Sequence, residues 1–272
     1  MTMRPHLSLP KELEKFRKDI ESTMQPTIKI STSTNKPTLF ESKFAGYPYL
    51  PKNFEHPIDG KGNYMKLLAQ INFEDLPRVL NDMPQKGMLQ IFLSGDDDVM
   101  GLDFNNQTNQ KNFRVIYHED ILKEGEVTTD FSYMTTFEDE HFPIGDEVSL
   151  SFSVNFEAVS TPDRAFDEFY GELDFEEIVG EDENGDEITL LELYEENLSN
   201  EGHKIGGYAF FTQSDPREDR SYKHYDVLLL QIDTDDDNEI MWGDCGVANF
   251  FIKVEDLKKL DFSNVLYNWD CH

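Results

Sequence analysis

The residues best suited to chemistry form a run of alternating acids near the carboxyl end of the chain. They occupy several of the ligand places of a calcium-binding loop: Asp233, Asp235, Asp237, Glu239 and Asp244. The first three acids match places one, three and five and Asp244 matches place twelve, and calcium takes its ligands from oxygen atoms. Asn238 stands where such a loop usually has glycine. Calcium is therefore the candidate metal, and the simpler alternative is a solvated acidic hairpin that discourages edge pairing.

Two glutamines occupy equivalent places in two similar apolar segments, Gln70 in the first and Gln231 in the second. Strand geometry puts Gln70 on the same face as Tyr64 and Gln231 on the same face as Tyr225. A buried amide that bonds to backbone groups is the simpler interpretation, because buried polar groups need partners. In the alternative, both glutamines and both tyrosines line a cleft shared by the two segments.

Signatures of known catalytic machinery are missing from the sequence. It contains no G-x-S-x-G, H-E-x-x-H or C-x-x-C motif and no Gly-rich phosphate loop. Cys245 follows Asp244 directly, and an adjacent carboxylate disfavours the reactive thiolate. We therefore expect a binding protein without catalytic residues, and an enzyme is the least favoured class.

The charge of the chain limits its partners. It has 24 Lys and Arg against 55 Asp and Glu, a formal net charge of −31 at pH 7. Nucleic acids and anionic membranes are bound through Lys and Arg, so neither is an expected partner. No apolar run is long enough for a secretion signal or a membrane helix, and two cysteines make no disulfide framework. We expect a cytoplasmic protein, and the sequence leaves its oligomeric state open.

About half of this charge lies in one segment, residues 163–201, which contains sixteen acidic residues and one basic residue, Arg164. Helix-start signals and apolar spacing predict two acidic amphipathic helices here, joined by a turn at Asn184 and Gly185. Thr189 and Glu192 form a capping box for the second helix. A charged face of this kind predicts docking of a basic protein partner through complementary charge.

The chain also repeats itself. A shift of 161 positions superimposes eight identical residues within the 29 positions from 43 to 71. The pairs are Lys43/Lys204, Gly46/Gly207, Tyr47/Tyr208, Tyr64/Tyr225, Leu67/Leu228, Leu68/Leu229, Gln70/Gln231 and Ile71/Ile232. One strand-rich unit built twice explains this pattern. We therefore predict an α+β, sheet-dominated fold in which two β-rich repeats are related by a pseudo-two-fold axis, with the acidic helices at its periphery.

The segments of this predicted fold follow from hydrophobic periodicity and turn signals. Residues 1–272 form a single duplicated domain: an N-terminal helix and strand in 1–39, repeat one with extra strands in 40–160, an acidic helical insert in 161–202 and repeat two in 203–272. Strands are expected at 64–72, 88–93, 113–117, 148–156, 225–233 and 247–252, and a last one near 265–269. The N-terminal helix is expected to start near Ser8 and to pack on the body.

Five stretches of the sequence carry a resemblance to a known family: KFAGYPYLP (43–51), YMKLLAQINFEDLP (64–77), HKIGGYAFFTQSDPR (203–217), LLLQID (228–233) and MWGDCGVANFFI (241–252). Together they resemble the YwqG-like family of uncharacterised bacterial proteins, and the resemblance covers nearly the whole chain. It implies a single α+β fold with a duplicated core, and it brings no reaction and no catalytic residues. Some proteins of this kind are encoded beside secreted toxins, which suggests an immunity-like role. The alternative function is a small-molecule or calcium-binding module, with its site between the repeats or in the loop 233–244.

Overall fold

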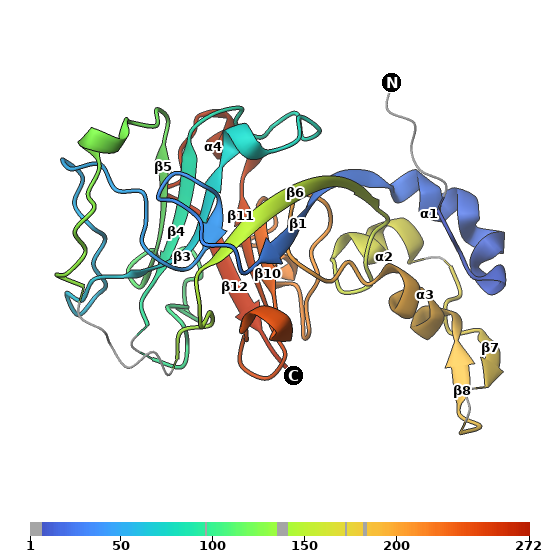
Figure 1. The fold of residues 1–272 in the computed structure, drawn as a ribbon. Coiled ribbons are helices and arrows are strands. Elements are labelled where there is room, and N and C mark those ends of the chain that lie inside the picture. Colours follow the sequence, from blue (N-terminus) through green and yellow to red (C-terminus); the bar gives the residue numbers. More distant parts are fainter. Residues whose placement is uncertain (1–6, 96, 135–140, 172, 182–183) are drawn as a thin grey trace.

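The fold is dominated by one antiparallel sheet of ten strands, in the order β12-β11-β10-β9-β1-β6-β2-β3-β4-β5 (Figure 1). The structure is a computed structural model, and it describes residues 7–95, 97–134, 141–171, 173–181 and 184–272. The strands of the sheet are β1 (Gln25–Ser33), β2 (Lys43–Phe44), β3 (Lys66–Asn72), β4 (Met88–Leu93), β5 (Phe113–His118), β6 (Val148–Glu157), β9 (Lys204–Ile205), β10 (Val227–Asp233), β11 (Val247–Ile252) and β12 (Leu266–Asp270). The sheet-dominated α+β architecture predicted from the sequence is confirmed.

The longest strands, β1 and β6, pair at the centre of the sheet. Nine residue pairs join them, from Gln25 opposite Glu157 to Ser33 opposite Ser149. The short strand β9 then joins the free side of β1, and β2 joins the free side of β6. Each side continues through three further strands, so the central pair divides the sheet into two groups of four strands.

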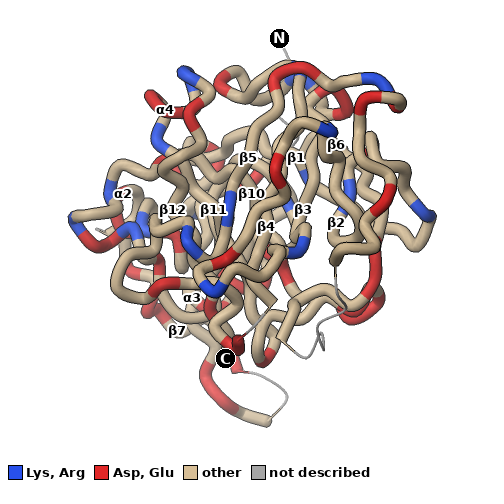
Figure 2. Tube along the Cα trace, turned by 90° about the vertical axis from the view of Figure 1, so that its left-hand side faces the viewer, with Lys and Arg blue, Asp and Glu red and all other residues tan. Residues whose placement is uncertain are grey.

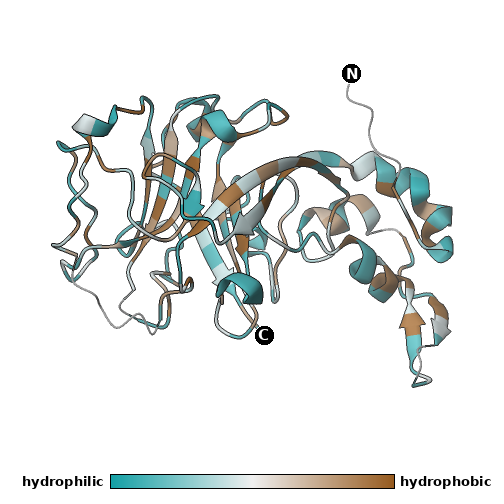
Figure 3. Cartoon of the chain, in the orientation of Figure 1, coloured by the Kyte–Doolittle hydropathy of each residue, from teal (hydrophilic) through white to brown (hydrophobic). Residues whose placement is uncertain are grey.

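The sheet curls so that residues of its two outermost strands meet. The ring centroid of Phe113 in β5 lies 5.1 Å from that of Tyr267 in β12, and Tyr267 stacks on Phe250 at 4.6 Å. The hydroxyl of Tyr267 also donates to the carbonyl oxygen of Met100 at 3.0 Å. The inner strands β4 and β11 are buried along their whole length, and apolar residues follow the strands in Figure 3. One apolar core therefore joins both groups of strands.

A smaller lobe of short helices lies at one end of the β1–β6 pair (Figure 1). Its elements are the 3₁₀-helix η1 (Lys11–Phe16), α1 (Arg17–Thr23), α2 (Ala165–Tyr170), α3 (Leu190–Leu198) and a hairpin of β7 (Ile178–Glu181) with β8 (Glu187–Thr189). They share an apolar cluster of their own, which includes Leu13, Ile20, Phe166 and Tyr194. Of the described helices, none is long and apolar enough to cross a membrane.

Two details of this lobe differ from the sequence prediction. The N-terminal helix begins at Lys11, with Pro10 rather than Ser8 before its first turn, and its first six residues are 3₁₀. Between α2 and α3 the chain forms the β7–β8 hairpin, with Gly185 at a φ of 88° between the strands, rather than a turn alone. The turn residue was predicted correctly. The strands beside it are too short and acidic for periodicity to reveal.

The remaining helical elements are short and connect strands. They are η2 (Phe73–Asp75), η3 (Glu124–Glu126), η4 (Pro216–Glu218), η5 (Asp236–Asn238) and α4 (Val254–Lys258).

Candidate functional site

An acidic cavity lies where the helical lobe meets the sheet. Its volume is about 670 Å³. Four acidic residues line it: Asp167, Glu195, Glu196 and Glu201. Four apolar residues form another part of the wall: Phe166, Leu191, Phe210 and Phe211. No lysine or arginine belongs to the lining that the structure describes, so the cavity combines negative charge with an apolar wall.

Helix α3 places two of these acids. Thr189 and Glu192 form the predicted capping box: the Glu192 backbone N–H donates to Thr189 Oγ1 at 3.2 Å, and the Thr189 N–H donates to Glu192 Oε2 at 2.7 Å. Tyr194 is buried, and its hydroxyl donates to the Val159 carbonyl oxygen at 2.6 Å. Because one side of α3 is fixed against the lobe, the next two residues along the helix, both glutamates, stay exposed.

A buried ion triad fastens this region to the sheet. The guanidinium of Arg217 donates to Asp163 Oδ2 at 2.8 Å and to Asp215 Oδ2 at 2.6 Å. All three residues are buried: Arg217 is 5% exposed, Asp163 is 4% exposed and Asp215 is 3% exposed. Arg217 also lies 4.2 Å from the ring centroid of Phe251 on β11. Burial works to lower the pKa of Arg217, but the two carboxylates outweigh it and raise that pKa.

The same carboxylates organise the backbone around the cavity. Asp163 accepts from the backbone N–H groups of Ala165, at the start of α2, and of Ala209. Asp215 accepts from the N–H of Arg164 at 3.1 Å. The two carboxylates thus bond to the backbone at the start of α2 and also to the backbone of Ala209. These shared hydrogen bonds fix the helical lobe to the sheet.

Three basic side chains in or near the lobe are already paired. Arg17 bonds to Glu14 and Glu21, and Lys15 bonds to Glu177. Arg164 pairs with Asp226 at 2.5 Å. Figure 2 shows acidic positions along the chain around α3 and β7. The carboxylates that line the cavity therefore have few cations of this chain nearby to balance them.

The first acids of the predicted calcium loop already have hydrogen-bond partners within the chain. Asp233 accepts from the N–H of Gly202 at 2.6 Å and from that of Thr234 at 2.8 Å. Asp235 accepts from Thr32 Oγ1 at 2.9 Å and from Asn238 Nδ2 at 2.8 Å. Their side-chain oxygens thus stabilise the loop itself.

The later acids of this loop, Asp237, Glu239 and Asp244, are exposed. Glu239 ends η5 in the left-handed region, at a φ of 54°. Within the described ranges, no group of three or more His, Cys, Asp or Glu side chains is arranged to hold a metal ion. Calcium binding stays a prediction.

The two glutamines are both fully buried, and both are bonded to backbone groups. Gln70 accepts from the N–H of Tyr49 at 2.7 Å, and Gln231 accepts from that of Phe210 at 2.8 Å. Four strands lie between β3 and β10 in the sheet order. Each amide is committed to its own part of the sheet, as the simpler interpretation of a buried amide predicts.

The two tyrosines differ in their surroundings. Tyr64 is 40% exposed and lines a second cavity together with His56 and Tyr133, whereas Tyr225 is 3% exposed and donates to Asn264 Oδ1 at 2.8 Å. A cleft shared by both glutamines and both tyrosines stays a prediction.

Sequence reasoning found the acids of the cavity but missed its apolar wall and the triad behind it. Phe210 and Phe211 fall within the second predicted repeat, 203–272, and no pattern there predicts a cavity wall. Asp163 and Arg217 are 54 residues apart, and no local pattern links them. The only signal in the sequence was Asp215 before a proline, which is typical of a helix start.

The comparison with protein families decides where this chain belongs. Residues 42–271 match the family described as "Domain of unknown function (DUF1963)". The chain is a member of the DUF1963 family. No curated protein matches it. The DUF1963 match spans β2 to β12 and thus includes α3, the cavity and the triad, whereas β1 and the N-terminal helices precede it.

Proposed function

We propose that this DUF1963 protein is a binding protein without catalytic residues, and that its acidic cavity docks a basic segment of a partner protein. The observation that carries the proposal is the lining of the cavity, which has four carboxylates, an apolar wall and no cation in its described part. Lys and Arg side chains fit such a lining, because a long apolar stem carries the charged group.

The carboxylates and the apolar wall of the cavity contribute to binding in different ways. Exposed ion pairs contribute only about 0.2–1 kcal/mol each, so the carboxylates mainly select and orient the partner. The net charge of −31 attracts a basic partner over a longer range and raises the rate of encounter. Burial of apolar surface against Phe210 and Leu191 supplies the rest of the affinity. The proposed partner therefore presents basic and apolar side chains together.

We also propose that the sheet arose by duplication of one unit, as in the YwqG-like proteins that the sequence resembles. A matching irregularity on the two sides of the sheet supports this. The pairing of β3 with β4 shifts between Leu67 and Ala69, and that of β10 with β11 shifts between Leu228 and Leu230. These positions are 161 residues apart, the same shift that aligns the repeated sequence.

A role like that of an immunity protein, which acts by binding a toxin, is one form of this proposal. It requires a cytoplasmic protein with a basic partner. The charge of the chain is consistent with a basic partner.

The experiment uses a fluorescent blocked peptide of alternating lysine and leucine as the basic probe. The variant Glu195→Lys/Glu196→Lys reverses two cavity charges, and Glu74→Lys/Glu255→Lys makes the same charge change at exposed positions outside the cavity lining. We expect the cavity variant to weaken binding by about tenfold or more, equal to about 1.4 kcal/mol, and the control by much less. Equal weakening in both variants would assign the binding to net charge and contradict a defined site.

A further inference from the structure

The strand β5 forms one edge of the ten-stranded sheet. Ser94 N–H donates to the Asn112 carbonyl oxygen at 2.8 Å, just before β5 begins. In an antiparallel pair, alternate residues direct their backbone groups to the neighbouring strand. In the register of β4 and β5, Arg114 and Ile116 therefore direct their backbone N–H and C=O groups to β4. Val115 and Tyr117 direct theirs away from β4, towards the open edge.

A side chain already occupies one place at this edge. The Val115 N–H donates to Gln110 Oε1 at 2.8 Å, and Gln110 Nε2 donates to the Phe262 carbonyl oxygen at 2.8 Å. The amide of Gln110 thus stands where the backbone of a neighbouring strand would be. In the described part of the chain no further strand follows β5, so the Val115 carbonyl and the backbone groups of Tyr117 have no ladder partner.

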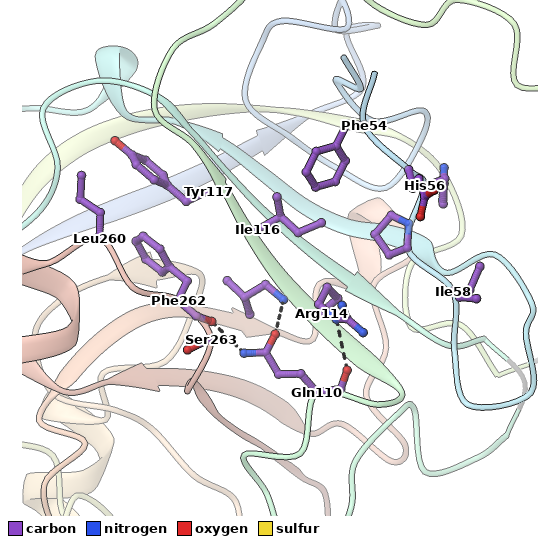
Figure 4. Close-up of a pocket in the computed structure, with 13 residues that line it drawn as sticks. Phe54, His56, Ile58, Gln110, Arg114, Ile116, Tyr117, Leu260, Phe262 and Ser263 are labelled. Carbon is purple, nitrogen blue, oxygen red and sulfur yellow. Dashed lines mark hydrogen bonds between the residues drawn. The ribbon is translucent and has the colours of Figure 1, made fainter. Parts of the chain in front are cut away.

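A cavity of about 550 Å³ borders this edge (Figure 4). Phe54 and Ile116 lie on one side of the strand, and Tyr117 and Phe262 lie on the other (Figure 4). Phe54 is 40% exposed. An added strand would place alternate side chains on the two faces of the sheet, and here each face offers an apolar surface.

Two charged residues line this cavity, Glu55 and Arg114, and Arg114 is the cation. Its side chain is exposed, and its Nε donates to the Gln110 carbonyl oxygen at 3.2 Å. Among the residues that the structure describes, Arg114 has no carboxylate within ion-pair distance. A guanidinium group binds carboxylates through two parallel N–H donors. The edge therefore combines open backbone groups, apolar surfaces on both faces and one available cation.

We propose that the β5 edge binds an extended peptide segment of a partner protein by strand addition, and that Arg114 pairs with an acidic side chain of that segment. An antiparallel segment continues the existing sheet. It takes the place of the Gln110 amide at the Val115 N–H, and it places apolar side chains opposite Tyr117, Ile116 and Val115 and an acid opposite Arg114. The recognised pattern is therefore three apolar residues followed by Asp or Glu. This site shares no lining residue with the acidic cavity, so it stands independently of the function proposed above.

The probe is the blocked peptide acetyl-Ser-Val-Ile-Val-Glu-Ser-amide, titrated into the full chain with binding followed by NMR. We expect binding in the micromolar to millimolar range together with slower hydrogen exchange of the Tyr117 amide. Arg114→Gln should weaken the affinity by about tenfold, whereas the neighbouring exposed cation variant Lys111→Gln should change it little. Arg114→Glu should bind the peptide with Lys in place of Glu better than the original.

Three outcomes would overturn the proposal. One is the absence of binding at millimolar peptide. A second is equal affinity for a peptide whose first valine, the residue opposite Tyr117, is replaced by proline, because strand addition requires that backbone N–H as a donor to Tyr117. The third is hexanoate binding as tightly as the peptide, which would assign the cavity to small apolar acids. Unchanged melting temperatures of the Arg114 variants separate lost binding from lost folding.

Discussion

Gln70 and Gln231 form matching hydrogen bonds on the two sides of the sheet. The Gln70 side-chain N–H group donates to the carbonyl oxygens of Leu39 and Glu41 at 3.0 and 2.9 Å. The Gln231 side-chain N–H group donates to those of Asn200 and Gly202 at 3.1 and 2.8 Å. Each amide oxygen accepts from one backbone N–H as well. Each of the two side chains therefore forms hydrogen bonds with three backbone groups that lie outside the strands.

Replacing either glutamine by leucine should destabilise the protein by about 2–4 kcal/mol, because a buried polar group without a partner costs about 1–3 kcal/mol. The two losses should be similar, since the bonds to backbone groups agree, and the loss at Gln70 should be the larger because its oxygen also accepts from Gln90 Nε2 at 2.8 Å. Urea unfolding measures both. Gln85→Leu, at an exposed position, is the control and should stay within about 0.5 kcal/mol. A small loss at one glutamine and a large loss at the other would contradict their equivalence.

The sequence could predict such local features because their signals are local. Apolar runs marked the strands around Gln70 and Gln231, and the pair Thr189 and Glu192 marked the start of α3. The pairing of β1 with β6 could not be predicted in this way. Gln25 and Glu157 are paired although they are far apart in the sequence. Periodicity shows that a strand exists, but it does not show which other strand pairs with it.

The candidate site was predictable only in part for the same reason. The acids of residues 163–201 were evident from composition. Their apolar neighbours Phe210 and Phe211 are brought to the cavity by tertiary contacts, as is Arg217. The β5 edge was identified as a strand, but its place at the edge depends on the order of all ten strands.

Removal of the Arg217 side chain should destabilise the protein strongly. In Arg217→Met, the buried carboxylates of Asp163 and Asp215 lose their cation, and an uncompensated buried charge costs about 3–5 kcal/mol. Urea unfolding measures the loss, and the exposed Arg220→Met is the control. Limited proteolysis should show cleavage between residues 160 and 202 first, because the triad fastens this region. A loss below about 1 kcal/mol would show that the triad is not an anchor.

Stability should fall as the solution is acidified from about pH 6.5 to about pH 4, partly because of His118. Burial lowers the pKa of His118 from 6.5 to about 4. Between these values the unfolded chain binds a proton that the folded protein does not, so the free energy of unfolding decreases as pH falls. The neutral ring donates from Nε2 to Gln90 Oε1 at 3.1 Å.

The variant His118→Gln keeps a hydrogen-bond donor and removes the titration. Its free energy of unfolding should depend less on pH in this range than that of the natural protein. His224→Gln, at an exposed position, is the matched control and should keep the natural slope. If both variants had the natural slope, the pH dependence would have to come from other groups, which include the carboxylates and the buried His56 and His203, whose pKa values burial also lowers.

The acidic and the apolar residues of the acidic cavity should contribute to peptide binding with different dependences on salt. At 0.1 M salt the screening length is about 10 Å, and it falls to about 3 Å at 1 M. Glu196→Gln removes a charge, so it should weaken binding of the lysine–leucine peptide at low salt and make the affinity less dependent on salt. Phe210→Ala removes apolar contact area and should weaken binding at every salt concentration, with the slope unchanged. Fluorescence anisotropy from 0.05 to 0.5 M salt measures both. If the two variants changed the slope equally, charge and apolar surface would not be separate parts of this site.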